Sequence, residues 1–516
     1  MVVLTGPPAL PSKAIRLLFA VLVVILFLYT NRLSRSQARN IKIDLNGLAA
    51  EGPPAEEQYL NRLKKEYGLT NHTAWSAWRI RTLEQDSEPE SVTNLNADFH
   101  SNEFNSIDVD NPIRSQLVAQ RQLDVTVPGG PLPAQVDASD FLFAVSTSYE
   151  KVKEADFAMV KNWARYLTGG NRFGNGATFL LVLDQSPEHQ ADELSEILKF
   201  QGIDAHITTT TARMSPAERY LGMMQIVKDL AGKLAQKGHR KKWFGILDDR
   251  VFLPNLSYLQ QRLFSYNSDR DVYVGVPSER ADWAIGDGFA TTYGGGAVFL
   301  TLSALSRIPG LPCIAEKGKS HNKGWDNVLQ DCLTHHTDMV MHVLPSFYSP
   351  SDNDEYAART DSYETGVMPL ALHHPEDRHQ LTPSTAHLVT DVCGESCFLQ
   401  RYRFTDNWIL VNGYAVTEYP DGMNMADMPG SGAGRKAVIG PLLVDDDGIK
   451  RKMLFYTGRR RVWRLLDSVR DSDGSVWQAY VKRASVEDTP SFKRSTDELM
   501  DSVIVLIWET AASSRQ

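Results

Sequence analysis

The feature that most constrains the fold is a regular alternation of apolar and amphipathic segments between residues 141 and 247. The apolar runs have the length and residue types of buried strands, and the amphipathic segments have helical spacing. Such alternation predicts a parallel sheet flanked by helices. We expect strands at Phe141–Val145, Thr178–Leu183, Ala205–Thr208 and Trp243–Leu247, and helices at Tyr149–Leu167, Ala191–Phe200 and Pro216–Gln236.

Two carboxylates, Asp248 and Asp249, follow the last of these strands directly. Ligands of open α/β sheets bind at the carboxyl ends of the strands, so this position favours a binding role for the pair. The alternative is a solvated strand end without function. Position in the fold therefore makes these two residues the first candidates for a site.

Three further features follow the Asp pair along the chain. A glycine turn contains Gly294 and Gly295, Asp326 precedes a helix-like segment, and His373 and His374 follow an extended one. Singly, each also fits a plain turn or a structural side chain. Together they match a reaction in which a diphosphate leaves: a cation held by oxygen ligands offsets its charge, and a carboxylate acts as general base.

The N-terminus carries an apolar run, Leu17–Tyr29, with basic residues on both sides. We expect an uncleaved signal anchor, because no small-residue cleavage site follows; a cleaved signal peptide and a buried helix are the alternatives. The predicted organisation is a short cytosolic tail (1–16), a signal-anchor transmembrane helix (17–30), a polar stem (31–135), an α/β domain (136–420) and a β-rich C-terminal region (421–516).

Composition narrows the classes of function. The chain has 516 residues, of which 42% are hydrophobic and 23% charged, as in ordinary globular proteins. Its formal net charge is −9, whereas nucleic-acid binders are typically basic, so we expect no nucleic-acid partner. Its four cysteines are expected to pair locally, Cys313 with Cys332 and Cys393 with Cys397, with four free thiols as the alternative.

Several motifs occur together and in a fixed order: KKWFGILDDR, YGGGAVFL, GWDNVLQDCL, SYETGVMPLALHH and DVCGESCFLQRY. Over residues 140–420 the chain resembles the Fringe-like glycosyltransferases, and most closely the fungal branch of glycosyltransferase family 31. The resemblance implies a GT-A fold, a type II membrane anchor and a Golgi or other secretory-pathway location. It also implies a UDP-sugar donor, a glycan or glycoprotein acceptor and a manganese ion (Mn2+).

The resemblance also assigns roles to individual residues. Asp248 and Asp249 match the first two positions of the family's Asp-Asp-Asp motif, and Gly294 and Gly295 match its glycine turn near the donor sugar. Asp326 matches the general base of an inverting transfer of a hexose or N-acetylhexosamine. His373 matches the histidine that joins the metal site together with Asp249, and His374 is its neighbour. Glu364 matches an acidic position before this segment, and Cys313 and Cys332 fall where the family places a disulfide bridge.

Two positions depart from the family pattern. Arg250 stands where the family has its direct metal ligand, and Ser346–Ser349 replaces a Leu-His-Gln-like motif. A guanidinium has no acceptor and cannot bind a cation. Three hypotheses follow: a metal-assisted transferase with the remaining ligands, a metal-independent transferase in which Arg250 pairs with the diphosphate, and a catalytically impaired relative that binds a glycan or a partner.

Overall fold

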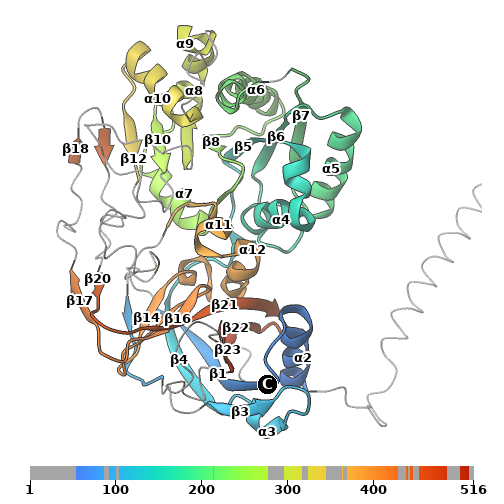
Figure 1. Ribbon diagram of the computed structural model, residues 1–516. Coiled ribbons are helices and arrows are strands. Elements are labelled where there is room, and N and C mark those ends of the chain that lie inside the picture. The colour runs from blue at the N-terminus through green and yellow to red at the C-terminus, as the bar shows by residue number, and fades with distance from the viewer. Residues whose placement is uncertain are drawn as a thin grey trace, which may run out of the picture. The chain divides into compact units, whose positions relative to one another are not determined.

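Figure 1 shows the computed structural model of the chain. The described residues are 54–85, 92–99, 104–212, 214–276, 296–315, 324–344, 363, 369–427, 437–439, 442–444, 452–484 and 500–510. The chain divides into two compact units, Met1–Tyr59 and Leu60–Gln516. Of the first unit only residues 54–59 are described, and the fold below is that of the second.

The predicted anchor at 17–30 and the tail at 1–16 lie outside the described residues. Among the helices that the structure does describe, none combines the length and the apolar character needed to cross a bilayer. This finding contradicts the predicted location, a single-pass type II protein of a Golgi or other secretory-pathway membrane, and that prediction is corrected here.

A nine-stranded mixed sheet holds the elements that the sequence predicts between 141 and 247. Its strand order is β18-β19-β12-β10-β11-β8-β5-β6-β7. Neighbouring strands from β8 to β7 are parallel, whereas β11 runs antiparallel to both β8 and β10. The bounds are β5 Phe141–Thr147, β6 Thr178–Leu183, β7 Ala205–Thr209, β8 Trp243–Leu247, β10 Tyr273–Val276, β11 Ala297–Thr301, β12 Met341–Val343, β18 Ala437–Ile439 and β19 Leu442–Val444.

Helices cover both faces of this sheet because its strands are apolar on both sides. Phe143 and Phe179 point into one apolar cluster with helices α4, α5 and α7, while Ala144 and Leu180 point into another with α6, α8 and α10. The predicted mixed α/β architecture is thus confirmed. The helix bounds are α4 Tyr149–Thr168, α5 Glu188–Phe200, α6 Pro216–Gln236, α7 Leu256–Phe264, α8 Leu302–Arg307, α9 Pro312–Ala315 and α10 Trp325–His336.

A second, ten-stranded sheet joins the N-terminal and C-terminal parts of the second unit. Its order is β2-β14-β15-β16-β21-β22-β23-β1-β3, and β4 also pairs with β1. Its strands are β1 His72–Gln85, β2 Thr93–Asn94, β3 Asn105–Asp108, β4 Arg121–Pro128, β14 Arg401–Arg403, β15 Trp408–Val411, β16 Ala415–Glu418, β21 Arg461–Arg470, β22 Val476–Lys482 and β23 Asp501–Thr510.

This sheet differs from the predicted stem and from the predicted boundary at 420. Within the 31–135 segment, β1 pairs in parallel with β23 over ten residues, and Trp75, Ile80 and Thr82 are buried along it. Serine and arginine between these residues make the strand look polar in the sequence. Strands β14 to β16, before residue 420, belong to the same sheet as β21 to β23.

The remaining described elements are short, apart from one helix. They are α2 Ala55–Tyr67, α3 Arg114–Leu117, β9 Val251–Phe252, β13 Leu372–His373, α11 Pro375–His379, α12 Pro383–Ala386, α13 Thr390–Cys393, β17 Asn424–Asp427, β20 Lys452–Phe455, and the 3-10 turns Pro133–Gln135, Ile308–Gly310, His387–Val389 and Glu395–Cys397. Strand β9 pairs with β13, and this pairing brings residues 372–373 to the segment that follows Asp248 and Asp249.

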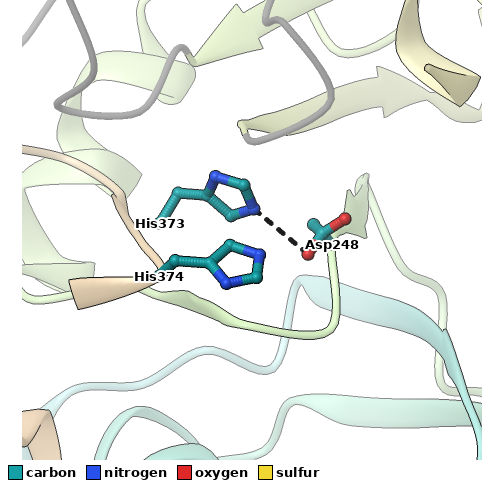
Figure 2. A group of neighbouring side chains, drawn as sticks. All are labelled: Asp248, His373 and His374. Atoms are coloured by element: carbon teal, nitrogen blue, oxygen red, sulfur yellow. Dashed lines mark hydrogen bonds and ion pairs between the residues drawn. The ribbon is translucent and has the colours of Figure 1, made fainter. Parts of the chain in front are cut away.

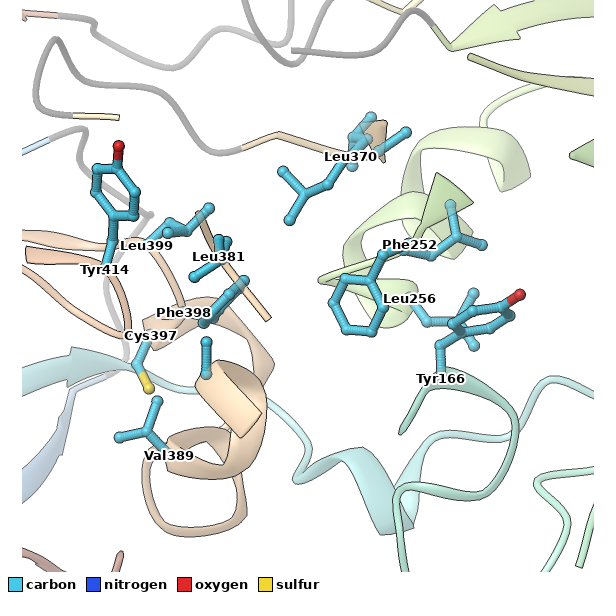
Figure 3. Close-up of a cluster of buried hydrophobic side chains, with 14 of the residues drawn as sticks. Tyr166, Phe252, Leu256, Leu370, Leu381, Val389, Cys397, Phe398, Leu399 and Tyr414 are labelled. Carbon is cyan, nitrogen blue, oxygen red and sulfur yellow. The ribbon is translucent and has the colours of Figure 1, made fainter. Parts of the chain in front are cut away.

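One apolar cluster extends from the nine-stranded sheet to the ten-stranded one. In Figure 3, Phe252 and Tyr166 belong to the first region, and Phe398 and Tyr414 lie beside the second. The expected cysteine pairs are confirmed: Cys313 bonds to Cys332 with 5.7 Å between their Cα atoms, and Cys393 bonds to Cys397 with 5.9 Å.

A buried ionic network lies in the same region. The Arg165 guanidinium donates to Asp391 Oδ1 at 2.8 Å and to His387 Nδ1 at 3.3 Å. His387 Nε2 lies 2.8 Å from the carbonyl oxygen of Pro254, which fixes the neutral tautomer with its proton on Nε2. Burial and the charge of Arg165 hold the pKa of His387 well below its usual value.

Candidate functional site

Asp248 and Asp249 lie at the carboxyl end of β8 and face different partners. Asp249 is 7% exposed, and its Oδ2 accepts hydrogen bonds from Thr147 Oγ1 at 2.7 Å and from Lys151 Nζ at 3.0 Å. Thr147 ends β5, which pairs in parallel with β8, and Lys151 lies in the first turn of α4. The parallel pairing of β5 with β8 therefore positions Asp249 to accept hydrogen bonds from the end of β5 and from the first turn of α4.

Asp248 instead contacts the histidines. Its Oδ1 lies 3.3 Å from His373 Nε2, and the same oxygen accepts the backbone N–H of Arg250 at 3.3 Å. Burial raises the pKa of Asp248, but the hydrogen bond and the electrostatic interaction with His373 outweigh it, so the pKa of Asp248 is lowered. The carboxylate is thus ionised at neutral pH.

Both imidazoles of the His-His pair lie on the same side as Asp248, as Figure 2 shows. Successive side chains of a strand point to opposite faces, so a continuous strand would separate the two rings. His374 avoids this because its backbone is left-handed, with φ 50° and ψ 47°, immediately after β13 ends at His373. The ring centroids are 4.1 Å apart. Left-handed backbone at a residue other than glycine is uncommon and clusters at functional sites.

The side chains of Asp248, His373 and His374 can supply three ligands to one metal ion, because one ligand atom from each lies within 4.8 Å of the others. Two imidazole nitrogens and a carboxylate oxygen suit a divalent first-row metal, and three protein ligands leave positions for the oxygens of a substrate. Burial, followed by the electrostatic interaction with His373, lowers the pKa of His374, which favours the neutral imidazole that binds metals.

Arg250 points to carboxylates at the rim of this cluster. Its Nη1 lies 3.1 Å from Asp377 Oδ2, and its Nη2 lies 3.7 Å from Glu154 Oε2. The same Nη1 is 3.5 Å from His374 Nδ1, so a positive charge stands beside the possible metal ligand. The two carboxylates offset that charge and engage the guanidinium.

A cavity of about 410 Å³ opens next to the Asp pair. Asp249 and Arg250 line it from the segment after β8, Lys151 and Asn162 from α4, and Glu376 from α11. Burial, opposed by a hydrogen bond from Asn162 Nδ2 at 3.2 Å, raises the pKa of the Glu376 carboxyl. The cavity thus combines cationic and anionic groups beside the cluster.

Asp326 lies in a different environment. It occupies the first turn of α10 and is 2% exposed, and it is not among the residues lining the cavity. Its neighbour Trp325 stacks on Tyr220, with the ring centroids 4.6 Å apart. The Tyr220 hydroxyl donates to the Leu247 carbonyl at 2.8 Å, next to Asp248. Tyr220 therefore connects the N-terminus of α10 with the end of β8.

The structure brings together Asp248, His373 and His374, whereas the predicted metal pair was Asp249 with His373. Lys151 and Asp377 were missed by the sequence-based prediction. The signals for them were a basic residue in the first turn after β5 and an acidic residue three positions after His374. Gly294, Gly295, Glu364 and Ser346–Ser349 lie outside the described residues.

Comparison with known proteins was made by family, by sequence and by structure. No family model matches the chain, and no curated protein matches it. Similar solved structures include GlyE of Streptococcus pneumoniae TIGR4 (14% identity, 45% of this chain, 54% of GlyE, TM-score 0.30), LgtC in complex with donor and acceptor sugar analogs (12%, 45%, 86%, 0.27) and mouse xyloside xylosyltransferase 1 (11%, 45%, 96%, 0.27).

The chain therefore spans about half the length of GlyE. GlyE and LgtC are described as a glycosyltransferase and a galactosyltransferase. These structures share glycosyl transfer as their described activity, but the superpositions are too poor to assign this chain a common fold with them. The three solved structures named above are glycosyltransferases with low sequence identity to this mixed α/β chain.

Proposed function

We propose that the chain is a glycosyltransferase of GT-A type that transfers a hexose or N-acetylhexosamine from a UDP-sugar to a hydroxyl of a glycan, with a divalent cation at the donor diphosphate. The observation that carries the proposal is the Asp248–His373–His374 cluster at the carboxyl end of a parallel strand. The resemblance to the Fringe-like enzymes of family 31 supports the same assignment through the order of its motifs.

Asp248, His373 and His374 would hold the cation, and Mn2+ fits this mixture of oxygen and nitrogen ligands. When bound, the cation supplies positive charge that stabilises the leaving diphosphate. Asp249 has a positioning role in this proposal. Because Thr147 and Lys151 occupy its Oδ2, it fixes the start of α4 against the strand end.

Lys151 is a further candidate for contact with the donor. It lines the cavity, and its side chain is 48% exposed although its ammonium contacts Asp249. A lysine at this place can bind a phosphate oxygen as a point charge. The glycine turn at Gly294 and Gly295 remains the proposed contact to the donor sugar.

Asp326 remains the proposed general base of an inverting transfer. A general base must come within about 2.6–3.2 Å of the hydroxyl it deprotonates. Asp326 is 2% exposed, and its sequence neighbour Trp325 stacks on Tyr220, which bonds to the end of β8, so the proposal places the acceptor hydroxyl beside these rings.

The geometry around Arg250 bears on the three hypotheses for that residue. The metal-independent hypothesis needs a guanidinium available for the diphosphate, but Asp377 and Glu154 both contact this one. A metal-assisted enzyme is therefore favoured. The second candidate function is a catalytically impaired relative that binds a glycan or a partner, and the positive charge beside His374 is the observation that favours it.

The test uses the purified chain with UDP-glucose, UDP-galactose and UDP-N-acetylglucosamine, each with Mn2+ and with a chelator. Release of UDP and transfer to sugar acceptors are measured. The proposal expects turnover of one donor with Mn2+ and none with chelator. Turnover that survives the chelator would support the Arg250-diphosphate hypothesis, and binding of UDP without turnover would support the impaired relative.

Two variants separate the proposed roles. His373→Ala should remove metal-dependent UDP binding together with turnover, because a metal ligand is lost. Asp326→Asn should abolish transfer and keep UDP binding. Full transfer by Asp326→Asn would show that another group is the base. As a matched control, Asp192→Asn removes an exposed carboxylate from α5 and should change neither readout.

A further inference from the structure

The cavity of about 410 Å³ adjoins the metal cluster through two chain segments. Asp249 directly follows Asp248, and Glu376 comes two residues after His374. Asp249 and Glu376 both line the cavity. A diphosphate bound at the cluster would therefore place the group that is attached to it beside this cavity.

A break in α4 supplies the apolar part of the cavity lining. Within this helix the backbone of residues 155–157 is left-handed, with φ between 48° and 57°. Left-handed backbone in residues other than glycine is uncommon and clusters at functional sites. Ala155, Ala158 and Met159 line the cavity at the break and directly after it. The break thus gives the cavity an apolar wall close to the strand end that carries Asp249.

The polar part of the lining comes from α11, from α12 and from the later part of α4. Helix α12 packs against α4 (Figure 1). Asn162 of α4 donates from Nδ2 to Glu376 Oε1 at 3.2 Å, and its Oδ1 accepts the backbone N–H of Ser384 at 3.0 Å. These two bonds fix the amide of Asn162, which in turn fixes the carboxyl of Glu376 at the cavity.

The Glu376 carboxyl keeps acceptor capacity for a ligand. The residue is half-buried and lines the cavity. Apart from its own backbone N–H, Asn162 is the only described residue that donates a hydrogen bond to this carboxyl. A carboxylate has about four acceptor sites, so a ligand can still donate to it. The side chains of Ser384 and Thr385 line the same cavity and add hydroxyl groups.

This lining suits an uncharged sugar better than a nucleobase or an acidic sugar. A base needs a flat ring or an amide to pair with, but Trp163, which also lines the cavity, is 1% exposed, and the amide oxygen of Asn162 already accepts a bond. The Glu376 carboxylate would repel an acidic sugar. A hexose offers apolar C–H faces to the alanine and methionine wall, and its hydroxyls can donate to a carboxylate.

We propose that this cavity binds the transferred sugar of the donor, an uncharged hexose or N-acetylhexosamine, and that Glu376 selects the donor by accepting hydrogen bonds from its hydroxyls. The inference rests on the proposed glycosyltransferase function, which supplies the donor. Asn162 is a positioning residue that holds the Glu376 carboxyl. Asp326 is not among the residues that line the cavity, so the acceptor is placed elsewhere, beside Trp325.

The test is a set of calorimetric titrations of the purified chain in the presence of Mn2+. The ligands are UDP, UDP-glucose, UDP-galactose and UDP-N-acetylglucosamine. Analogues of the most tightly bound donor that each lack one sugar hydroxyl are titrated next. UDP alone reports the diphosphate site, whereas each analogue reports the contact made by a single hydroxyl.

We expect the wild type to bind one of these analogues about tenfold or more weakly than the parent donor, since the lost contact is a hydrogen bond to a charged group. Glu376→Ala should bind the parent donor and that analogue alike and should keep the affinity for UDP. Glu376→Gln keeps an acceptor for Asn162 and should lose part of the discrimination. As a matched control, Glu196→Ala removes an exposed carboxylate from α5 and should change none of these affinities.

No discrimination by the wild type, or the same discrimination in the wild type and both Glu376 variants, would overturn the inference. Loss of UDP affinity in both variants would also overturn it, because Glu376 would then support the structure of the site. The same holds if Glu376→Ala binds donors like the wild type but has a raised KM for the acceptor, because the cavity would then hold the acceptor.

The failure of this inference can be told apart from the failure of the proposed function. If the wild type does not bind UDP with Mn2+, the proposed donor function fails and the inference fails with it. If the wild type binds UDP and a UDP-sugar but its discrimination between analogues does not depend on Glu376, only the sugar subsite fails.

Discussion

The two large sheets differ in how their strands are gathered and in what they offer at their surfaces. The nine-stranded sheet takes four successive parallel strands, and their carboxyl ends place Thr147, Asp248 and Asp249 together. The ten-stranded sheet takes strands from both ends of the second unit, with β1 lying beside β23. Strands that are close in the sequence thus bring charged groups together at one edge of the nine-stranded sheet. The pairing of strands that are far apart in the sequence forms the ten-stranded sheet.

The two sheets should therefore respond differently to substitution. At the carboxyl edge of the nine-stranded sheet, polar groups are held by a few hydrogen bonds and their loss should affect chemistry. In the ten-stranded sheet, large buried side chains dominate and their loss should affect stability.

The largest effect is expected in the ten-stranded sheet. Trp508 is fully buried, and its indole N–H donates to Gln478 Oε1 at 2.7 Å. Trp508→Ala should lower the free energy of unfolding by about 3–5 kcal/mol, because it leaves a cavity. Trp508→Phe should cost less, about 1–3 kcal/mol, from the smaller ring and from the lost hydrogen bond to Gln478 Oε1, which keeps its bond from the Tyr480 hydroxyl at 3.0 Å. Urea denaturation measures both, and a cost below 1 kcal/mol for Trp508→Ala would contradict this assignment.

The next effect concerns the edge of the nine-stranded sheet. Asp248→Asn removes the charge of the carboxylate that contacts His373 and should reduce turnover of the UDP-sugar at least about 100-fold by weakening cation binding. UDP release by the folded variant measures it. Asp192→Asn serves again as the control. Turnover within a few-fold of the wild type would show that Asp248 is not a ligand.

The third prediction concerns the buried network between the sheets, where His387 and Arg165 meet Asp391. Because the pKa of His387 is lowered in the folded chain, the unfolded chain takes up a proton first as the pH falls below about 6.5. Stability contributed by the neutral ring is present above that pH and is lost below it, at about 1.4 kcal/mol per pH unit.

The pH dependence of unfolding in wild type and His387→Asn isolates this contribution from those of other groups. Between pH 6 and 5 the free energy of unfolding should fall with decreasing pH more steeply in the wild type than in the variant. The difference in slope should correspond to the uptake of about one proton on unfolding. Equal slopes in the two proteins would mean that His387 does not stay neutral in the folded chain.

The smallest effect is expected at Arg250. Its guanidinium lies 3.5 Å from His374 Nδ1 and opposes a cation there, although its 28% exposure and its two carboxylate partners weaken the effect. Arg250→Gln should therefore tighten Mn2+ binding about fivefold. Mn2+ titration followed by electron paramagnetic resonance measures this affinity, and a weaker affinity in Arg250→Gln would mean that Arg250 supports the site.

Much of the nine-stranded sheet could be predicted from the sequence because its strands are continuously apolar. The bounds of β6, α6 and β8 match the expected segments to the residue. Strand β1 was missed because half-buried residues, among them Ser76, Arg79 and Arg81, separate its buried ones. Its partner β23 is also more than four hundred residues away, which no local pattern reveals.

The candidate site could be predicted in part, because some of its residues follow strands that the sequence pattern identifies. The ends of strands are local features, so Asp248 and Asp249 could be placed. Which of the two meets His373 depends on side-chain direction and on Lys151, a contact between separate elements. The left-handed backbone at His374 directs this ring to the same side as His373 and so makes it a possible metal ligand. No sequence pattern predicts that backbone conformation.

The central claim is that Asp248, His373 and His374 hold a divalent cation. Anomalous diffraction from crystals of the chain grown with Mn2+ and UDP tests it most directly. We predict one manganese peak bonded to Asp248, His373 and His374 and to the UDP diphosphate. A peak bonded to Asp249 instead, or UDP bound with Arg250 at its diphosphate and no manganese, would contradict the claim.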